Sequence, residues 1–406
     1  MRTLIQNATV FDTDTLDFVG ERAIEVEDGR IVAVDASATA NADRVIDARG
    51  RFALPGLIDA HVHFRLVSLD FRRVSTMTEV EFGIRMARLA RETVERGFTS
   101  VRDTGGELRG LMSAIAQGET RGPRIVRSGQ MISQTGGHGD VEGGPREVPD
   151  CACQMRHTAF GIVADGPDAV RKAARHLLRE GSDFLKIHVS GGVASPSDPL
   201  DSVQYTDAEV AAAVEEADHR RTYVTAHAYL PESIQMAVRN GVRVIEHGNL
   251  LDEETARTMA DAGTIMVPTL VTYQAMGDLG RALGLPAANV EKNASVLEAG
   301  LRSIELAANA GIEMGWGTDL LGETQNRQNQ EFAIRAEVQS AKDLLGSMFL
   351  TNPRLLRLEG EIGRIAPGAA GDVVLTERNP LDDIRVLADP ANLRLVVQAG
   401  EVVCER

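Results

Sequence analysis

The chain has 406 residues, of which 43% are hydrophobic, so it can form one large domain and a smaller one. Its net charge of −16 argues against nucleic acids and anionic membranes as partners. No apolar run approaches the ~18–20 residues of a membrane span, and Met1–Ile5 does not begin a signal peptide. We therefore expect a cytoplasmic protein that binds neither nucleic acids nor membranes.

The cysteines agree with a reducing compartment. Cys151, Cys153 and Cys404 are too few for a disulfide framework. The pair Cys151-Ala152-Cys153 has the spacing of a weak metal motif, but two free thiols in a loop are the preferred interpretation.

Both chain ends carry short strand signals separated by turns. Residues 1–55 contain three such runs, and Asp28-Gly29 between two of them predicts a hairpin. The C-terminal runs Gly371–Leu375 and Leu393–Val397 are similar in character. The sequence therefore predicts one small β-sandwich domain made from residues 1–56 and 354–406.

Residues 57–353 alternate apolar strands with helical patterns. One helix is predicted by apolar residues from Val80 to Val94 at helical spacing, and Thr206 and Glu209 form a capping box that opens another. Eight strands are predicted, near residues 57–64, 98–103, 124–129, 184–189, 223–229, 242–249, 264–270 and 313–319. An α/β fold with a (β/α)₈ TIM barrel over 57–353 is the architecture that this alternation favours.

The first of these strands carries His61 and His63. Side chains alternate along a strand, so both imidazoles share one face while Val62 and Phe64 occupy the other. Two such rings can reach one metal ion. The alternative is a pair of ordinary surface histidines, which an apolar strand disfavours because buried polar rings need partners.

Further polar residues interrupt other predicted strands near their carboxyl ends, where barrel active sites lie. They are Lys186, His227, His247 and Asp319. His227 and Tyr229 have the parity of one strand face, and His188 shares a face with Lys186. His188 is either a satisfied core histidine or a group beside the metal or the substrate. The set as a whole predicts a metal site rather than independent core residues.

Lys186 needs its own explanation because an ammonium group is no metal ligand and is costly to bury unpaired. One possibility is a structural ion pair with a buried carboxylate. The other is that a neutral amine takes up CO₂ and becomes a carbamate, an anion whose two oxygens can bridge two divalent ions.

With these motifs in hand, the chain resembles the metal-dependent amidohydrolase superfamily over essentially its whole length. The resembling segments are Pro55–His63, Leu185-Lys186-Ile187, Ala226-His227-Ala228, Glu246-His247-Gly248, Gly317-Thr318-Asp319, Gly363–Gly368 and Gly371–Val374. The resemblance implies two divalent ions, most compatible with zinc, with manganese, cobalt or iron as alternatives. His61, His63 and Asp319 would hold the buried ion, His227 and His247 the outer one, and carboxylated Lys186 would bridge them.

More narrowly, the chain is similar to the bacterial branch of Xaa-Pro and Xaa-Arg(Lys) dipeptidases. The similar segments are Thr135–Asp140, Lys186 leading to Gly191–Val193, and His227–Tyr229. This similarity implies that His138 and Tyr229 hold the free carboxylate of the substrate. The alternative for His138 is an exposed histidine in a glycine-rich loop.

The segment after Asp319 departs from that branch. Leu320–Asn326 lacks the histidine that dipeptidase-like members often carry there, which favours relatives that hydrolyse ureas, carbamates or small amides. Substrate selection is expected from the strand-to-helix loops, above all residues 133–166. Further candidate contacts, of unassigned role, are Arg156, His157 and Tyr273.

The resemblance implies hydrolysis of a C–N bond by a hydroxide that bridges the two ions, with Asp319 first accepting and then donating a proton. The leading hypothesis is a hydrolase that releases a C-terminal amino acid from dipeptides or N-acyl amino acids. The alternative is a hydrolase of small ureas, carbamates or xenobiotic amides. A catalytically dead scaffold is disfavoured because every ligand is present. The resemblance also implies a small-molecule substrate and a homo-oligomeric assembly.

Overall fold

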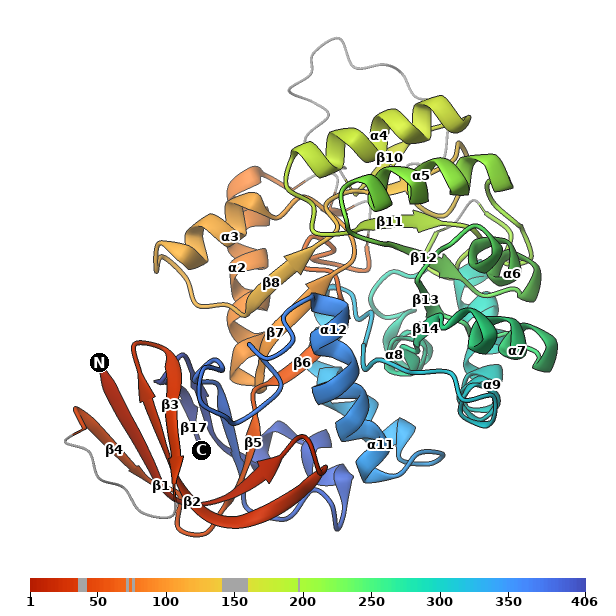
Figure 1. Ribbon diagram of the computed structural model, residues 1–406. Coiled ribbons are helices and arrows are strands. Elements are labelled where there is room, and N and C mark those ends of the chain that lie inside the picture. The colour runs from red at the N-terminus through yellow and green to blue at the C-terminus, as the bar shows by residue number, and fades with distance from the viewer. Residues whose placement is uncertain (36–41, 71–72, 75–76, 141–159, 196–197) are drawn as a thin grey trace.

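The computed structural model describes residues 1–35, 42–70, 73–74, 77–140, 160–195 and 198–406. The strands of both chain ends lie side by side at one side of the molecule (Figure 1). They form one eight-stranded sheet in the order β17-β16-β15-β5-β1-β2-β3, with β4 paired to β1. The bounds are β1 (Arg2–Asp12), β2 (Asp17–Glu27), β3 (Arg30–Asp35), β4 (Arg44–Asp47), β5 (Phe52–Pro55), β15 (Val373–Thr376), β16 (Leu393–Gln398) and β17 (Glu401–Glu405).

The prediction that the two chain ends combine is confirmed by the pairing of β5 with β15, in which Pro55 faces Val373. The hairpin is confirmed as well, because Asp28 and Gly29 form the turn between β2 and β3. Both turn residues have positive φ, +48° and +81°, as tight hairpin turns require. The structure describes these strands as a single sheet, so their arrangement as a sandwich stays a prediction.

The middle of the chain builds two parallel sheets. One has the order β6-β7-β8 and the other β10-β9-β11-β12-β13-β14. Their bounds are β6 (Leu57–Val62), β7 (Phe98–Asp103), β8 (Arg124–Arg127), β9 (Met131–Ser133), β10 (Gly161–Val163), β11 (Leu185–His188), β12 (Val224–Ala228), β13 (Val244–His247) and β14 (Ile265–Val267). Seven of the eight predicted strands are therefore present, while β9 and β10 were not predicted.

The eighth predicted strand, residues 313–319, is not assigned as a strand, but it makes one parallel bridge, between Met266 and Met314. Backbone hydrogen bonds tie this segment to its neighbours on both sides. Met266 N donates to Glu313 O at 3.0 Å, and Ala60 N donates to Trp316 O at 2.9 Å. The segment therefore lies between β14 and β6, which brings Asp319 beside the first strand.

Helices follow most of the parallel strands and cover their outer face (Figure 1). The bounds are α2 (Glu79–Glu95), α3 (Arg109–Ala116), α4 (Pro167–Arg179), α5 (Asp207–His219), α6 (Pro231–Arg239), α7 (Glu253–Ala262), α8 (Leu270–Leu279), α9 (Ala287–Asn309), α10 (Glu331–Arg335), α11 (Ala341–Gly346) and α12 (Asn352–Leu356). Alternating strands and helices confirm the α/β class. Every described helix is too short or too polar to cross a membrane.

Two helix predictions have different outcomes. The capping box is confirmed, because the Thr206 and Glu209 side chains close the start of α5 as predicted. In α2 the predicted helix is present, but part of its apolar face was wrong. Val80 and Ile84 are 72% and 65% exposed, whereas Ala90 and Val94 are buried. Phe82 and Met86 bury instead, since they lie on the stripe that faces β7.

Candidate metal centre

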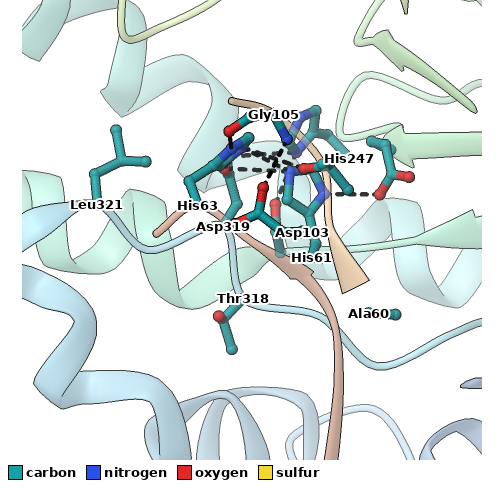
Figure 2. A network of polar contacts seen from close by, with 12 residues as sticks. Ala60, His61, His63, Asp103, Gly105, His247, Thr318, Asp319 and Leu321 are labelled. Carbon is teal, nitrogen blue, oxygen red and sulfur yellow. Dashed lines mark hydrogen bonds and ion pairs between the residues drawn. The ribbon is translucent and has the colours of Figure 1, made fainter. Parts of the chain in front are cut away.

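The two histidines of the first parallel strand point at the same place, as their spacing predicts. His61 Nε2 lies 3.2 Å from His63 Nε2. Both nitrogens also face Asp319 Oδ1, at 3.3 Å for His61 and 3.1 Å for His63 (Figure 2). Two imidazole nitrogens and a carboxylate oxygen converging at buried positions form a donor set typical of zinc and similar divalent ions.

Glu246 orients the ring of His61. Its Oε2 lies 2.7 Å from His61 Nδ1, so that hydrogen-bonding to Nδ1 leaves Nε2 free to act as a ligand. Arg102 and Thr225 both donate to the other carboxylate oxygen of Glu246. Burial raises the pKa of Glu246, but Arg102, His61 and Lys186 outweigh it and hold that pKa well below its usual range. Glu246 is therefore an anion inside the core.

Asp319 is held in an uncommon backbone conformation with φ of +53°. Its amide donates to His61 O at 2.8 Å, and the preceding Thr318 donates its hydroxyl to Asp59 Oδ2 at 2.7 Å. Burial raises the pKa of Asp319, but the neighbouring histidines, His61 foremost, outweigh burial and keep that pKa well below its usual range. His247 also has positive φ, +73°. Backbone strain of this kind persists where surrounding contacts fix it, often at functional sites.

His247 joins the same group from β13. Its Nδ1 lies 2.8 Å from Thr269 Oγ1, and its ring centroid is 5.1 Å from that of His61. The ligand atoms of His61, His247 and Asp319 all lie within 4.8 Å of one another, an arrangement that could hold a metal ion (Figure 2). The structure thus brings together residues from β6, β13 and the segment after residue 313.

Lys186 lies on β11 and is only 1% exposed. Its Nζ has no hydrogen-bond partner among the described residues. Burial lowers the pKa of Lys186 to about 8, although the carboxylates of Glu246 and Asp319 oppose this shift. A buried amine without a partner and with a lowered pKa fits the predicted carbamate, because only the neutral amine can attack CO₂. No carboxylate lies within hydrogen-bonding distance of Lys186 Nζ among the described residues, which disfavours the alternative of a structural ion pair.

His227, from β12, completes the predicted set. Its ring centroid lies 4.6 Å from that of His247, and burial lowers the pKa values of both rings well below their usual range. Neutral imidazoles are the form that binds metal. All six predicted ligands line one cavity.

The predicted substrate contacts lie in the same cavity. His138 stacks on His227 with centroids 4.3 Å apart and lies 14% exposed by its side chain, so it is no free surface histidine. Tyr229 is buried, and its hydroxyl lies 2.9 Å from that of Tyr273. His188 also lines the cavity, and its Nδ1 has no partner among the described residues. The four residues Cys151, Cys153, Arg156 and His157 lie outside the described residues.

Several functional neighbours were missed from the sequence. Glu246, Arg102 and Asp59 are fully buried charged residues, each inside an apolar strand. That interruption was a usable signal, because charged groups are buried only when they are paired. Asp198, which contacts His138, follows a glycine-rich loop and carries no such signal.

Comparison with known proteins agrees with this geometry. Residues 52–403 match the amidohydrolase family. The chain is 29% identical to an ochratoxinase from Aspergillus niger over 361 residues, covering 86% of this chain and 75% of the relative. It is 41% identical to a solved prolidase in complex with N-methylphosphonate-L-proline, with a TM-score of 0.95 and complete coverage of both chains. A solved Xaa-Pro dipeptidase with bound methionine in the active site is 29% identical, with a TM-score of 0.88 and complete coverage of both chains.

The family match covers far more than half of the chain and includes every candidate ligand. The solved relatives align along the full length, so both the strands that carry the cavity and the sheet of the chain ends belong to the shared fold. The chain belongs to the amidohydrolase family and is a hydrolase that acts on carbon–nitrogen bonds.

Proposed function

We propose that this protein is a metal-dependent hydrolase that releases a C-terminal amino acid from dipeptides or N-acyl amino acids. One observation carries the proposal above the others. The Nε2 atoms of His61 and His63 converge on Asp319 Oδ1, in the cavity that also holds the unpartnered Lys186 amine.

We assign two divalent ions, most compatible with zinc, with manganese, cobalt or iron as alternatives. The residues that would hold them are His61, His63, Lys186 as a CO₂-derived carbamate, His227, His247 and Asp319. Such ions, when bound, lower the pKa of water from ~15.7 towards ~7 and polarise the scissile carbonyl.

The chain's own contribution to the chemistry is the handling of the proton. Asp319 lines the cavity as an anion, and its Oδ1 faces His61 and His63. We assign it the proton of the attacking water and the transfer of that proton to the leaving nitrogen. Thr318, anchored by Asp59, holds the segment that carries this carboxylate.

The substrate's free carboxylate is assigned to His138 and Tyr229, whose rings lie beside that of His227. Support comes from their place in the cavity and from the two solved relatives, a prolidase with a proline-based ligand and a Xaa-Pro dipeptidase. The rest of the substrate meets apolar side chains, because the cavity is also lined by Leu66, Met131, Phe160, Met276 and Leu321.

We also propose the finer architecture. The hydrogen bonds on both sides of residues 313–319 support closure of the parallel strands into a (β/α)₈ barrel over residues 57–353. Residues 1–56 and 354–406 would form a separate small β-sandwich domain. A homo-oligomer is proposed from the resemblance, and a cytoplasmic location from the low number of cysteines.

The test is a paired assay on purified protein whose metal content has been measured. Dipeptides and N-acyl amino acids are compared with the matching C-terminal amides, in the wild type and in Tyr229→Phe. We expect the free carboxylates to be preferred, and Tyr229→Phe to reduce that preference by about 10–100-fold, the loss of a hydrogen bond to a charged group. Equal turnover of acids and amides by the wild type would reject the proposal.

A second function is favoured by the segment after Asp319. Leu321 lines the cavity where that segment enters, and it can bind neither a carboxylate nor an amine. This favours small ureas, carbamates or xenobiotic amides without a free carboxylate. The same assay separates the two functions when neutral ureas and carbamates are included in the panel.

A further inference from the structure

The ring of His138 is closely packed by two neighbours. It stacks on His227 at a centroid distance of 4.3 Å and an interplanar angle of 24°. The backbone of Gly192 also lies against it, so that a Cβ added to this glycine would collide with the imidazole ring. A glycine at position 192 is therefore required by the ring itself, and not by the backbone conformation.

Asp198 meets the same ring at its edge. Its Oδ2 lies 3.5 Å from His138 Nδ1, within ion-pair distance. The carboxylate is 2% exposed and accepts hydrogen bonds from Gly192 N at 2.8 Å and Gln204 Nε2 at 3.3 Å. Gln204 in turn accepts a hydrogen bond from His138 N at 2.9 Å. One small network thus holds the backbone and the ring of His138.

The loop that supplies Asp198 is anchored from outside by α9. Lys292 Nζ donates to the backbone oxygens of Gly192, at 3.2 Å, and Asp198, at 2.5 Å. One turn earlier, Asn289 Nδ2 donates to Val193 O at 2.6 Å. The amine is satisfied by carbonyls, so it leaves the Asp198 carboxylate available to His138. These hydrogen bonds hold the loop behind His138 without any contribution from a substrate.

We propose that Asp198 is a positioning residue that acts through His138, fixing the orientation in which this imidazole meets the substrate. This inference rests on the proposed function only in assuming that His138 touches the substrate. It does not depend on whether the contacted group is a carboxylate or another polar group. Asp198 itself does not line the cavity, so its effect on turnover has to pass through the ring.

The experiment is a double-mutant cycle on the metal-loaded enzyme with Asp198→Asn, His138→Asn and the double variant. Asparagine keeps the size of the side chain and an oxygen for Gly192 N. We expect Asp198→Asn to lower kcat/KM by about 10–100-fold, as supporting residues of active sites do. The double variant should be no slower than His138→Asn alone. Effects that multiply would show that Asp198 acts independently of His138 and would overturn the proposal.

Asp372→Asn is the matched control. Asp372 is also a buried aspartate that accepts hydrogen bonds from the backbone amide of Ala399 and from the Arg124 side chain, but it directly precedes β15 in the sheet of the chain ends. We expect kcat/KM to be unchanged in this variant. A drop equal to that of Asp198→Asn would mean that loss of any such aspartate slows the enzyme, which would overturn a specific positioning role.

A structural readout keeps the proposal testable if His138→Asn has no measurable turnover. A crystal structure of metal-loaded Asp198→Asn should show the His138 ring turned away from its stack on His227. An unchanged ring would overturn the proposal. If the wild type prefers amides or ureas, the carboxylate assignment fails, but the cycle is then run on the preferred substrate and still decides the role of Asp198.

Discussion

The two sides of the candidate metal centre differ in how the fold satisfies their polar atoms. On the β6 side, His61 contacts Glu246 through Nδ1 and Asp319 through Nε2, and Glu246 is itself paired with Arg102. On the β11 side, Lys186 Nζ is buried without a hydrogen-bond partner among the described residues. The polar atoms on the β6 side are therefore satisfied by other protein groups, whereas the Lys186 amine on the β11 side has no protein partner among the described residues.

The physical consequence is a difference in stability. A buried, paired charge network is costly to break, whereas an unpartnered buried polar group destabilises the folded state by about 1–3 kcal/mol. The β6 side should therefore stabilise the metal-free protein, and the β11 side should weaken it. Substitutions that remove these groups should therefore lower the stability of the metal-free protein on the β6 side and raise it on the β11 side.

The largest effect is expected at Asp319, which belongs to the β6 side but is also assigned the proton transfer. Asp319→Asn should lower kcat by about 10²–10⁴-fold, the usual contribution of general acid–base catalysis, while metal is retained. Steady-state kinetics and metal analysis on the same sample check this. Near-normal turnover with full metal content would show that Asp319 only holds the centre together.

The next effect is loss of stability at Glu246. Glu246→Gln leaves Arg102 buried beside a neutral partner, so the free energy of unfolding of the metal-free protein should fall by about 3–5 kcal/mol. Denaturant unfolding measures it. The control is Glu377→Gln, which removes an exposed partner of Arg51 and Arg394 and should change stability by less than about 1 kcal/mol. Equal losses would contradict the contrast between the two sides.

On the β11 side, a substitution should raise the stability of the metal-free protein instead of lowering it. Lys186→Met replaces an unpartnered amine by an apolar chain of similar length, so metal-free stability should rise by about 1–3 kcal/mol. Activity should be lost in the same variant, because no carbamate can form. Lys292→Met makes the same chemical change where the amine donates to three backbone carbonyls, and should destabilise. A destabilised Lys186→Met would refute the proposed asymmetry.

The smallest effect concerns the rate of assembly. Metal-free protein that is reloaded with zinc in bicarbonate-depleted buffer should regain activity more slowly than protein reloaded with bicarbonate. The reason is that the Lys186 amine needs CO₂ before it can act as a ligand. Lys186→Met should regain none under either condition. Recovery at the same rate in both buffers would argue against the carbamate.

Much of the site could be predicted from the sequence because its residues interrupt apolar strands. Alternation along β6 correctly placed His61 and His63 on one face, and parity on β12 placed His227 and Tyr229 in one cavity. Strand ends meet at one edge of a parallel sheet, so residues far apart in the chain could be grouped without knowing their contacts.

The rest depended on packing between distant elements, which no local pattern encodes. Lys292 and Asn289 reach the loop of Asp198 from α9, nearly a hundred residues further along the chain, and neither belongs to a motif. The exposed Val80 and Ile84 show the same limit, because helical spacing alone could not tell which stripe of α2 faces β7. The eighth strand was located correctly, yet its pairing is too sparse to continue beyond one bridge.

The pairing of β5 with β15 also has a consequence for synthesis. Pro55 faces Val373, and Thr3 donates its hydroxyl to Gly400 O, so the sheet unites segments that most of this chain separates. During translation of the residues between them, the nascent chain carries β5 with one edge unpaired, and such edges invite association with other chains. This edge of β5 is therefore covered only after residues 57–372 have been translated and β15 can pair with it.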